Sequence, residues 1–311
     1  MTNLAQRVLT AVIAIPVIIA AAMYGGIAFF LFVALLSWFA LAEFYKLTEA
    51  KGAKPLRAAG LAAGVAINAA FFHVQLRAWI AAMFAQDGAS IPFPSGEQLL
   101  LIVFILSLAV LLLAELFRNN GSAMLNLGAT VLGLVYVPLF LGTFIGLREM
   151  FTRTDLAVAH HFLMLGGSAD GESIYASGGA TVIAVFAMIW LCDTAAYQVG
   201  RKIGTHKLFP RISPNKSWEG AVAGFLFSVG GAVAAKYLAL SYLPLVHAVV
   251  LGCLVGTIGQ LGDLTESLFK RDAGVKDSSA RIPGHGGVLD RFDSLLLVAP
   301  VVYLYLDFIV F

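Results

Sequence analysis

The chain has 311 residues, of which 60% are hydrophobic and 12% are charged, and its formal net charge is +2. This composition is too apolar for an ordinary soluble domain and indicates a polytopic membrane protein. The basic residues lie in loops between apolar runs instead of forming one stripe, which argues against nucleic acid as a partner. Cys192 and Cys253 lie within apolar runs and predict neither a disulfide framework nor a zinc site.

Apolar runs long enough to cross a bilayer recur along the whole chain. A transmembrane helix needs about 20 apolar residues. The segments that meet this requirement lie near residues 8–24, 27–45, 57–83, 98–117, 124–147, 179–199, 219–241, 245–262 and 289–311. We therefore expect an all-α fold of about nine transmembrane helices. N-terminal helices would occupy residues 1–150, and a C-terminal catalytic region residues 151–311. His73 and Arg77 interrupt the third segment and predict an irregular helix there.

The distribution of lysine and arginine predicts how the chain crosses the membrane. If the N-terminus is cytoplasmic, the basic loop from Lys46 to Arg57 is cytoplasmic too, as the positive-inside rule prefers. The same alternation places loops near 200–218 and 263–288 on the cytoplasmic face and the C-terminus outside. Cleavage of the first segment as a signal peptide would reverse this pattern, so we expect the segment to be retained. The predicted location is a bacterial inner membrane.

Two acidic helix faces flank a loop near the C-terminus, each with polar residues spaced i, i+3, i+4. They comprise Asp263, Glu266, Ser267 and Lys270 before the loop, and Asp290, Asp293 and Ser294 after it. Carboxylates at a membrane boundary are costly unless they are paired or bind a cation. Such hard oxygen ligands suit Mg²⁺, whereas the simpler alternative is that these charges only favour helix ends.

The glycine-rich stretch from Pro283 to Gly287 separates the two acidic faces. Its bare amides precede a helix N-terminus, a combination that favours an anion. The bases around it are Lys270, Arg271, Lys276 and Arg281. Bases, amides and acidic metal ligands together suit a nucleoside triphosphate with Mg²⁺, although no Walker-type sequence is present. His285 could act as a general base, bind phosphate or stabilise the loop.

A second polar segment runs from residue 193 to residue 220. Asp193 either lines a site or forms an intramembrane pair with Arg201. The bases of this segment could hold a phosphate head group, or could simply follow the positive-inside rule. Lys216 is the favoured substrate contact among them. Ser217 is expected to cap the seventh helix.

A family resemblance rests on these two segments. The phosphatidate cytidylyltransferases, or CDP-diacylglycerol synthases, carry a signature similar to Ser267-Leu-Phe-Lys-Arg, four residues, then Lys276-Asp-Ser-Ser-Ala-Arg-Ile-Pro-Gly-His-Gly-Gly-Val-Leu-Asp-Arg-Phe-Asp293. Their second block resembles Asp193-Thr-x-Ala-Tyr-x-x-Gly-Arg and Ile-Ser-Pro-x-Lys-x-Trp-Glu-Gly220, with departures at Thr205 and Asn215. The resemblance implies a membrane enzyme of phospholipid biosynthesis that joins CTP to phosphatidic acid, giving CDP-diacylglycerol and pyrophosphate.

The resemblance also implies roles for individual residues. Asp263 and Asp290 would hold a catalytic Mg²⁺, with Asp293 nearby and a monovalent cation such as K⁺ in support, and Asp193 is a further metal candidate. The predicted catalytic residues are Asp263, Asp290, Lys270, Arg271, Lys276 and His285. The predicted substrate contacts are Arg201, Ser213, Lys216, Arg281, Gly286, Gly287 and Arg291. The expected partners are CTP, phosphatidic acid and the lipid bilayer, with a homodimer as a further option.

Two alternatives remain open at this stage. A cation-coupled transporter would use the carboxylates as an ion path, but these charges lie at one face instead of the bilayer midplane, where transporter sites tend to lie. Another Mg²⁺-dependent lipid phosphotransferase or kinase would share the metal and the lipid. The chain has no Asp-Gly-x-x-Ala-Arg block of the kind that the CDP-alcohol phosphotransferases carry.

Overall fold

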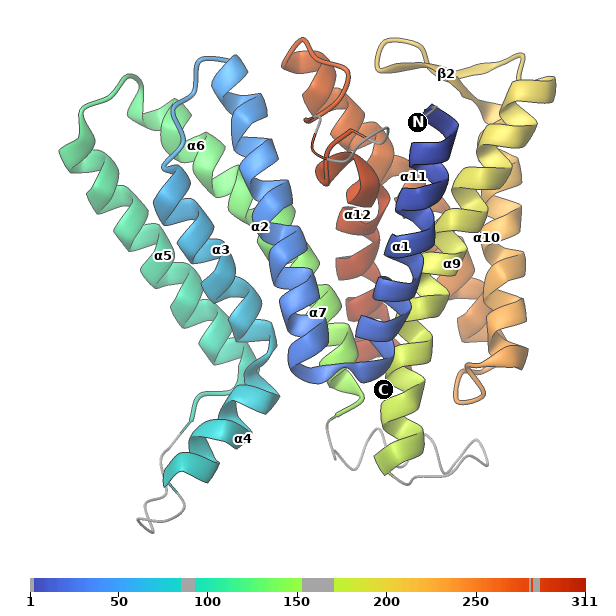
Figure 1. Ribbon diagram of the computed structural model, residues 1–311, viewed down its shortest axis with the longest axis horizontal. Helices are drawn as coiled ribbons and strands as arrows, with labels where there is room; N and C mark the ends of the chain where they lie inside the picture. Colours follow the sequence, from blue (N-terminus) through green and yellow to red (C-terminus); the bar gives the residue numbers. More distant parts are fainter. Residues whose placement is uncertain (1–2, 85–92, 153–170, 280, 282–285) are drawn as a thin grey trace.

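The computed structural model describes residues 3–84, 93–152, 171–279, 281 and 286–311, and most of them are helical (Figure 1). The helices are α1 (Asn3–Tyr24), α2 (Gly26–Ala50), α3 (Arg57–Phe71), α4 (His73–Phe84), α5 (Gly96–Arg118), α6 (Ala123–Leu134), η2 (Val135–Leu139), α7 (Phe140–Met150), α9 (Gly171–Ile203), α10 (Trp218–Leu238), α11 (Leu245–Asp272), α12 (Leu289–Tyr305) and η3 (Leu306–Val310). Strands β1 (Lys207–Phe209) and β2 (Ser213–Ser217) form an antiparallel hairpin.

The helices confirm an all-α polytopic membrane protein. Seven of those in the described ranges are long and apolar enough to cross a membrane, or eight if α3 and α4 count as one span. These two helices meet at an angle of 81°, so the irregularity expected at His73 is present. The apolar part of α1, Thr10–Tyr24, is shorter than the roughly 20 residues of a full span. The count of nine and the orientation stay predictions.

Two groups of helices lie side by side along the long axis of the molecule. Figure 1 shows α2, α3, α5, α6 and α7 on one side and α1, α9, α10, α11 and α12 on the other, with the two chain ends at opposite ends of the bundle. Helix α12 joins the groups because it packs against α7 and α2 as well as α11. Its residues Leu296, Val298, Ala299 and Val302 are fully buried.

Small residues bring α10 and α11 into close contact. A Cβ atom added at Gly252 would lie 2.7 Å from the Cα atom of Val229, and one added at Gly256 would lie 3.1 Å from the Cα atom of Phe225. A side chain would clash at Gly252 and would be crowded at Gly256. The α11 backbone is thereby held against α10, which fixes the position of the acidic end of α11.

The polar segments contain more helix than the sequence predicted. Helix α9 continues to Ile203, into the expected loop near 200–218, and α11 continues to Asp272, so that it carries the predicted acidic face from Asp263 to Lys270. The charges of α11 do not end the helix because Lys270 pairs with Glu266 one turn earlier. The second predicted acidic face is wrong: Phe292 has non-helical angles, φ −124° and ψ 15°, so a kink separates Asp290 from the turn that follows.

Candidate active site

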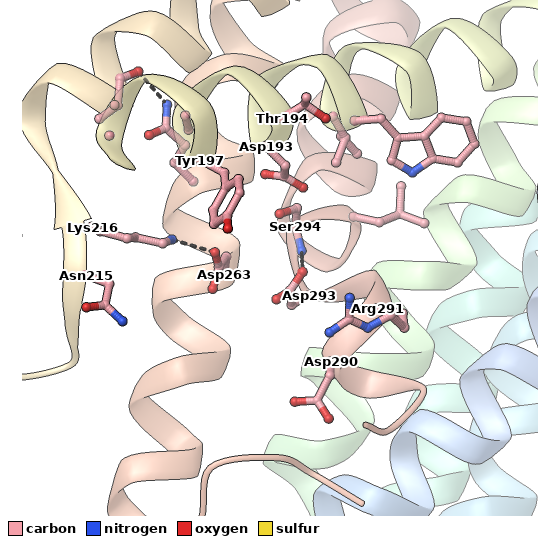
Figure 2. A pocket seen from close by; sticks show the side chains of 18 of the residues that line it. Asp193, Thr194, Tyr197, Asn215, Lys216, Asp263, Asp290, Arg291, Asp293 and Ser294 are labelled. Carbon is pink, nitrogen blue, oxygen red and sulfur yellow. Dashed lines mark hydrogen bonds and ion pairs between the residues drawn. The ribbon is translucent and has the colours of Figure 1, made fainter. Parts of the chain in front are cut away.

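A pocket of about 1050 Å³ lies among α1, α9, α10, α11 and α12, next to the hairpin. Its polar end is lined by residues of both charged segments (Figure 2). These include Asp193, Arg201, Lys216, Asp263, Lys270, Asp290, Arg291 and Asp293. Its apolar wall is formed by Ile15 and Ile18 of α1 and by Phe186, Ile189 and Trp190 of α9. One pocket thus joins a charged region to an apolar surface within the helices.

An ion pair brings the two polar segments together. Lys216 at the end of the hairpin places its Nζ atom 2.6 Å from Oδ2 of Asp263 on α11. The Oδ1 atom of Asp263 accepts a hydrogen bond from Ser267 at 3.3 Å. Arg271 adds a second link, because its Nε atom donates to the carbonyl of Ile212 at 3.3 Å. The two polar segments therefore lie together, and the membrane face on which they lie stays a prediction.

Three carboxylates from three helices point into the same space: Asp193 from α9, Asp263 from α11 and Asp293 from α12 (Figure 2). Asp293 accepts a hydrogen bond from the amide of Ser294 at 2.7 Å. Asp193 makes no hydrogen bond or ion pair within the described ranges, and Arg201 contacts Tyr197 instead. Among the residues that the structure describes, no three acidic, histidine or cysteine side chains are close enough to bind one metal ion as they stand.

Asp290 has a different environment from the other three carboxylates. Its Oδ1 atom accepts from Lys270 Nζ at 2.7 Å. Its Oδ2 atom accepts from the amide and the hydroxyl of Ser278, both at 2.9 Å, and from the amide of Gly287 at 2.7 Å. The side chain is 2% exposed. Both oxygens are therefore occupied in holding the chain around the glycine-rich stretch.

The described glycines of this stretch lie directly against carboxylates. Gly286 has a φ of +81°, which side chains rarely adopt, and a Cβ atom there would lie 2.8 Å from Oδ2 of Asp290. A Cβ atom at Gly287 would meet Ser278 and Glu43. The close approach of backbone to carboxylate explains both glycines, and the Gly287 amide is already used by Asp290.

The predicted bases are distributed over different surroundings. Arg201, Lys216, Lys270 and Arg291 line the pocket, whereas Arg271, Lys276 and Arg281 do not. Ser213, a predicted substrate contact, also lies outside the lining. Arg271 also donates to the carbonyl of Val275 at 3.0 Å, and Arg281 lies over the Phe39 ring at 5.1 Å. Lys276 is exposed. His285 lies outside the described residues.

Hydrogen bonds between residues at the two ends of the hairpin close it. Ser217 caps α10 as predicted, because its hydroxyl accepts from the amide of Gly220 at 3.2 Å. Glu219 accepts from the Thr205 hydroxyl at 2.8 Å and from the amide of His206 at 3.1 Å. Thr205, one of the two departures from the family pattern, therefore belongs to the closure of the hairpin. Lys216 precedes the cap directly and is held in place by it.

Sequence reasoning missed Glu43 on α2, which is fully buried. Its carboxylate accepts from the hydroxyls of Ser278 at 2.9 Å and Ser279 at 2.6 Å, and from the amide of Leu289 at 2.9 Å. The signal was present, because an acidic residue inside the apolar run 27–45 needs a partner. The identity of that partner, more than two hundred residues away, was not readable from the pattern.

Comparison with known proteins agrees with these features. Residues 5–309 match the cytidylyltransferase family. A phosphatidate cytidylyltransferase of Synechocystis sp. is 32% identical over 305 residues, covering 96% of this chain and 95% of the relative. One from Staphylococcus saprophyticus is 30% identical over 300 residues, covering 96% and 98%. One from Brucella suis is 45% identical over 129 residues, covering 41% and 47%. The chain belongs to the cytidylyltransferase family.

Proposed function

We infer that this protein transfers the cytidylyl group of CTP to phosphatidic acid, giving CDP-diacylglycerol and pyrophosphate. The observation that carries this function is the single pocket in which Lys216, Asp263 and Arg291 lie next to an apolar wall of α1 and α9. A nucleotide needs the charged residues, and a phosphorylated lipid needs both the charged residues and the apolar wall. Relatives named phosphatidate cytidylyltransferase match the chain over nearly its whole length.

The reaction is a displacement at phosphorus. An oxygen of the phosphatidic acid phosphate forms a bond to the α-phosphorus of CTP, and the bond from that phosphorus to the bridging oxygen breaks, so that pyrophosphate leaves with the electron pair. A phosphate monoester is already anionic near neutral pH, so the nucleophile needs no general base. Positioning and charge neutralisation dominate such transfers. Lys216, Arg201 and Arg291 are placed in the pocket to neutralise phosphate oxygens.

The carboxylates of the pocket fit Mg²⁺. Asp193, Asp263 and Asp293 would hold it, since they present only oxygen donors, which Mg²⁺ prefers, from three helices toward one space. The bound ion would neutralise charge on the triphosphate. Asp290 fits this role less well because Lys270 and the amides of Ser278 and Gly287 already occupy its oxygens. Lys270 lines the pocket while it is held by Asp290 and Glu266.

The lipid reaches the site from within the bilayer. Moving acyl chains out of lipid costs about 0.8 kcal/mol per CH₂, so the chains stay in an apolar environment while the head group reacts. The wall formed by Ile15, Ile18 and Trp190 continues from the charged end of the pocket and offers that environment. We place the site on the cytoplasmic side of a bacterial inner membrane, where the basic loops favour it.

A direct assay tests the function. Purified protein in detergent micelles with phosphatidic acid, Mg²⁺ and CTP labelled in the cytidine is expected to give a label that extracts into organic solvent, with one pyrophosphate released per labelled lipid. Omitting phosphatidic acid or adding a chelator should abolish both signals. Label that remains in the aqueous phase with the complete mixture would contradict the proposal.

A further inference from the structure

Glu43 lies in the N-terminal part of the chain, yet its described hydrogen bonds all go to the signature segment near the C-terminus. Its Oε2 atom accepts from Ser278 Oγ and from the amide of Leu289, both at 2.9 Å, and its Oε1 atom accepts from Ser279 Oγ at 2.6 Å. Arg281 Nε lies 3.9 Å from Oε1. One carboxylate thus ties both sides of the glycine-rich stretch to α2.

Glu43 and Asp290 act on the same piece of backbone. The Ser278 hydroxyl lies 2.9 Å from Oε2 of Glu43 and 2.9 Å from Oδ2 of Asp290, and its single proton can serve only one of them at a time. The chain at Gly287 passes so close to Glu43 that a Cβ atom there would lie 2.9 Å from its Cδ atom. Asp290 in turn holds Lys270. A continuous set of contacts therefore runs from α2 to the pocket.

A packing role alone does not explain a carboxylate at this position. Burying a charge within a membrane protein is costly, and an apolar side chain would fill the space at lower cost. What the carboxylate adds is direction, because its two oxygens accept from Ser279 on one side of the glycine-rich stretch and from Leu289 on the other, and also face the Ser278 hydroxyl. Hydrogen bonds to a charged acceptor are shorter and stronger than neutral ones, and they fix the donors in place.

We propose that Glu43 is a positioning residue of the active site, which holds Ser278, Ser279 and Leu289 where they fix Asp290 and, through it, Lys270 at the edge of the pocket. Helix α2 does not line the substrate pocket, so Glu43 acts through the signature segment and not by touching the substrates. Its effect on activity rests on the proposed function, because the nucleotide is defined there. Its effect on the backbone does not.

The test compares Glu43→Gln with Glu115→Gln. Glutamine keeps the size of residue 43 but turns an amide donor toward other donors. Glu115 is a matched control, because it is a buried glutamate of the N-terminal part, 5% exposed, that accepts from Asn126 at 2.6 Å and lies on α5, away from the pocket.

We expect Glu43→Gln to lower kcat/KM for CTP about 10- to 100-fold, as small misplacements in active sites do. The KM for phosphatidic acid should stay within about twofold. Glu115→Gln should change neither value.

Hydrogen exchange provides a readout that needs no activity. In Glu43→Gln the amide of Leu289 should exchange faster than in the wild type, whereas Glu115→Gln should leave it unchanged. Ser279→Ala removes the 2.6 Å bond to Glu43, together with the 3.3 Å bond that the Arg281 amide donates to the Ser279 hydroxyl. It should shift the CTP kinetics in the same direction, which decides the matter if Glu43→Gln does not fold. Wild-type CTP kinetics and Leu289 exchange in the Glu43 variant would overturn the inference, as would an equal loss in the Glu115 variant. Absence of lipid product from the wild type would contradict only the function.

Discussion

Asp263 and Asp290 each begin an i, i+3, i+4 pattern of polar residues, but their surroundings in the structure differ. Asp263 is part-exposed and pairs with Lys216 across the pocket, where the two side chains are 32% and 24% exposed. Asp290 is buried, and its hydrogen bonds go to Lys270, Ser278 and Gly287. The first arrangement suits a group that exchanges its partner for a metal or a substrate. The second suits a group that fixes the backbone.

This difference predicts separate effects for Asp263→Asn and Asp290→Asn. Breaking a buried pair typically costs 3–5 kcal/mol, so Asp290→Asn should lower the thermal unfolding temperature clearly as well as the activity. A part-exposed pair is worth about 0–1 kcal/mol, so Asp263→Asn should leave the unfolding temperature nearly unchanged. Its activity should fall about a hundredfold or more, as expected for lost electrostatic stabilisation. Unfolding in detergent and initial rates measure both. An unchanged unfolding temperature in Asp290→Asn together with lost activity would favour Asp290 as a metal ligand.

At the scale of elements, α1 provides one wall of the pocket although it is the least typical of the expected spans. Ile15 of α1 lines the pocket and is 38% exposed, whereas Ile19, one turn further along, is 40% exposed and does not line it. The two residues are matched in type and in exposure. They differ in whether they face the space that we assign to the acyl chains.

A bulky side chain on each of these positions tests the acyl wall. Ile15→Trp should reduce the rate with long-chain phosphatidic acid about tenfold, since a misfit in an apolar pocket has effects of that order. A short-chain, water-soluble phosphatidic acid should react at nearly the wild-type rate. Ile19→Trp should behave as wild type with both lipids. Equal rates of Ile15→Trp and Ile19→Trp on the long-chain lipid would show that the chains do not lie along α1.

At the scale of the whole molecule, sequence patterns predicted the features that neighbouring residues determine, such as helices and their caps. Hydropathy predicted the helical segments, and the residues before Trp218 predicted the Ser217 cap of α10, which is confirmed. The kink at Phe292 was not predictable, because the residues around it read as a regular helix start. Glu43 was missed for another reason: its role depends on Ser278 and Leu289, which only the packing of α2 against the signature segment brings near.

Orientation across the membrane concerns the whole molecule, and α9 allows it to be tested within one helix. Glu172 lies in its first turn and Lys202 in its last, and both are exposed. If the site faces the cytoplasm, an impermeant maleimide added to intact cells should label Glu172→Cys and should label Lys202→Cys only after the membrane is permeabilised. The two native cysteines, Cys192 and Cys253, are replaced by alanine in the background. Labelling of Lys202→Cys in intact cells would place the pocket outside, where cytoplasmic CTP could not reach it.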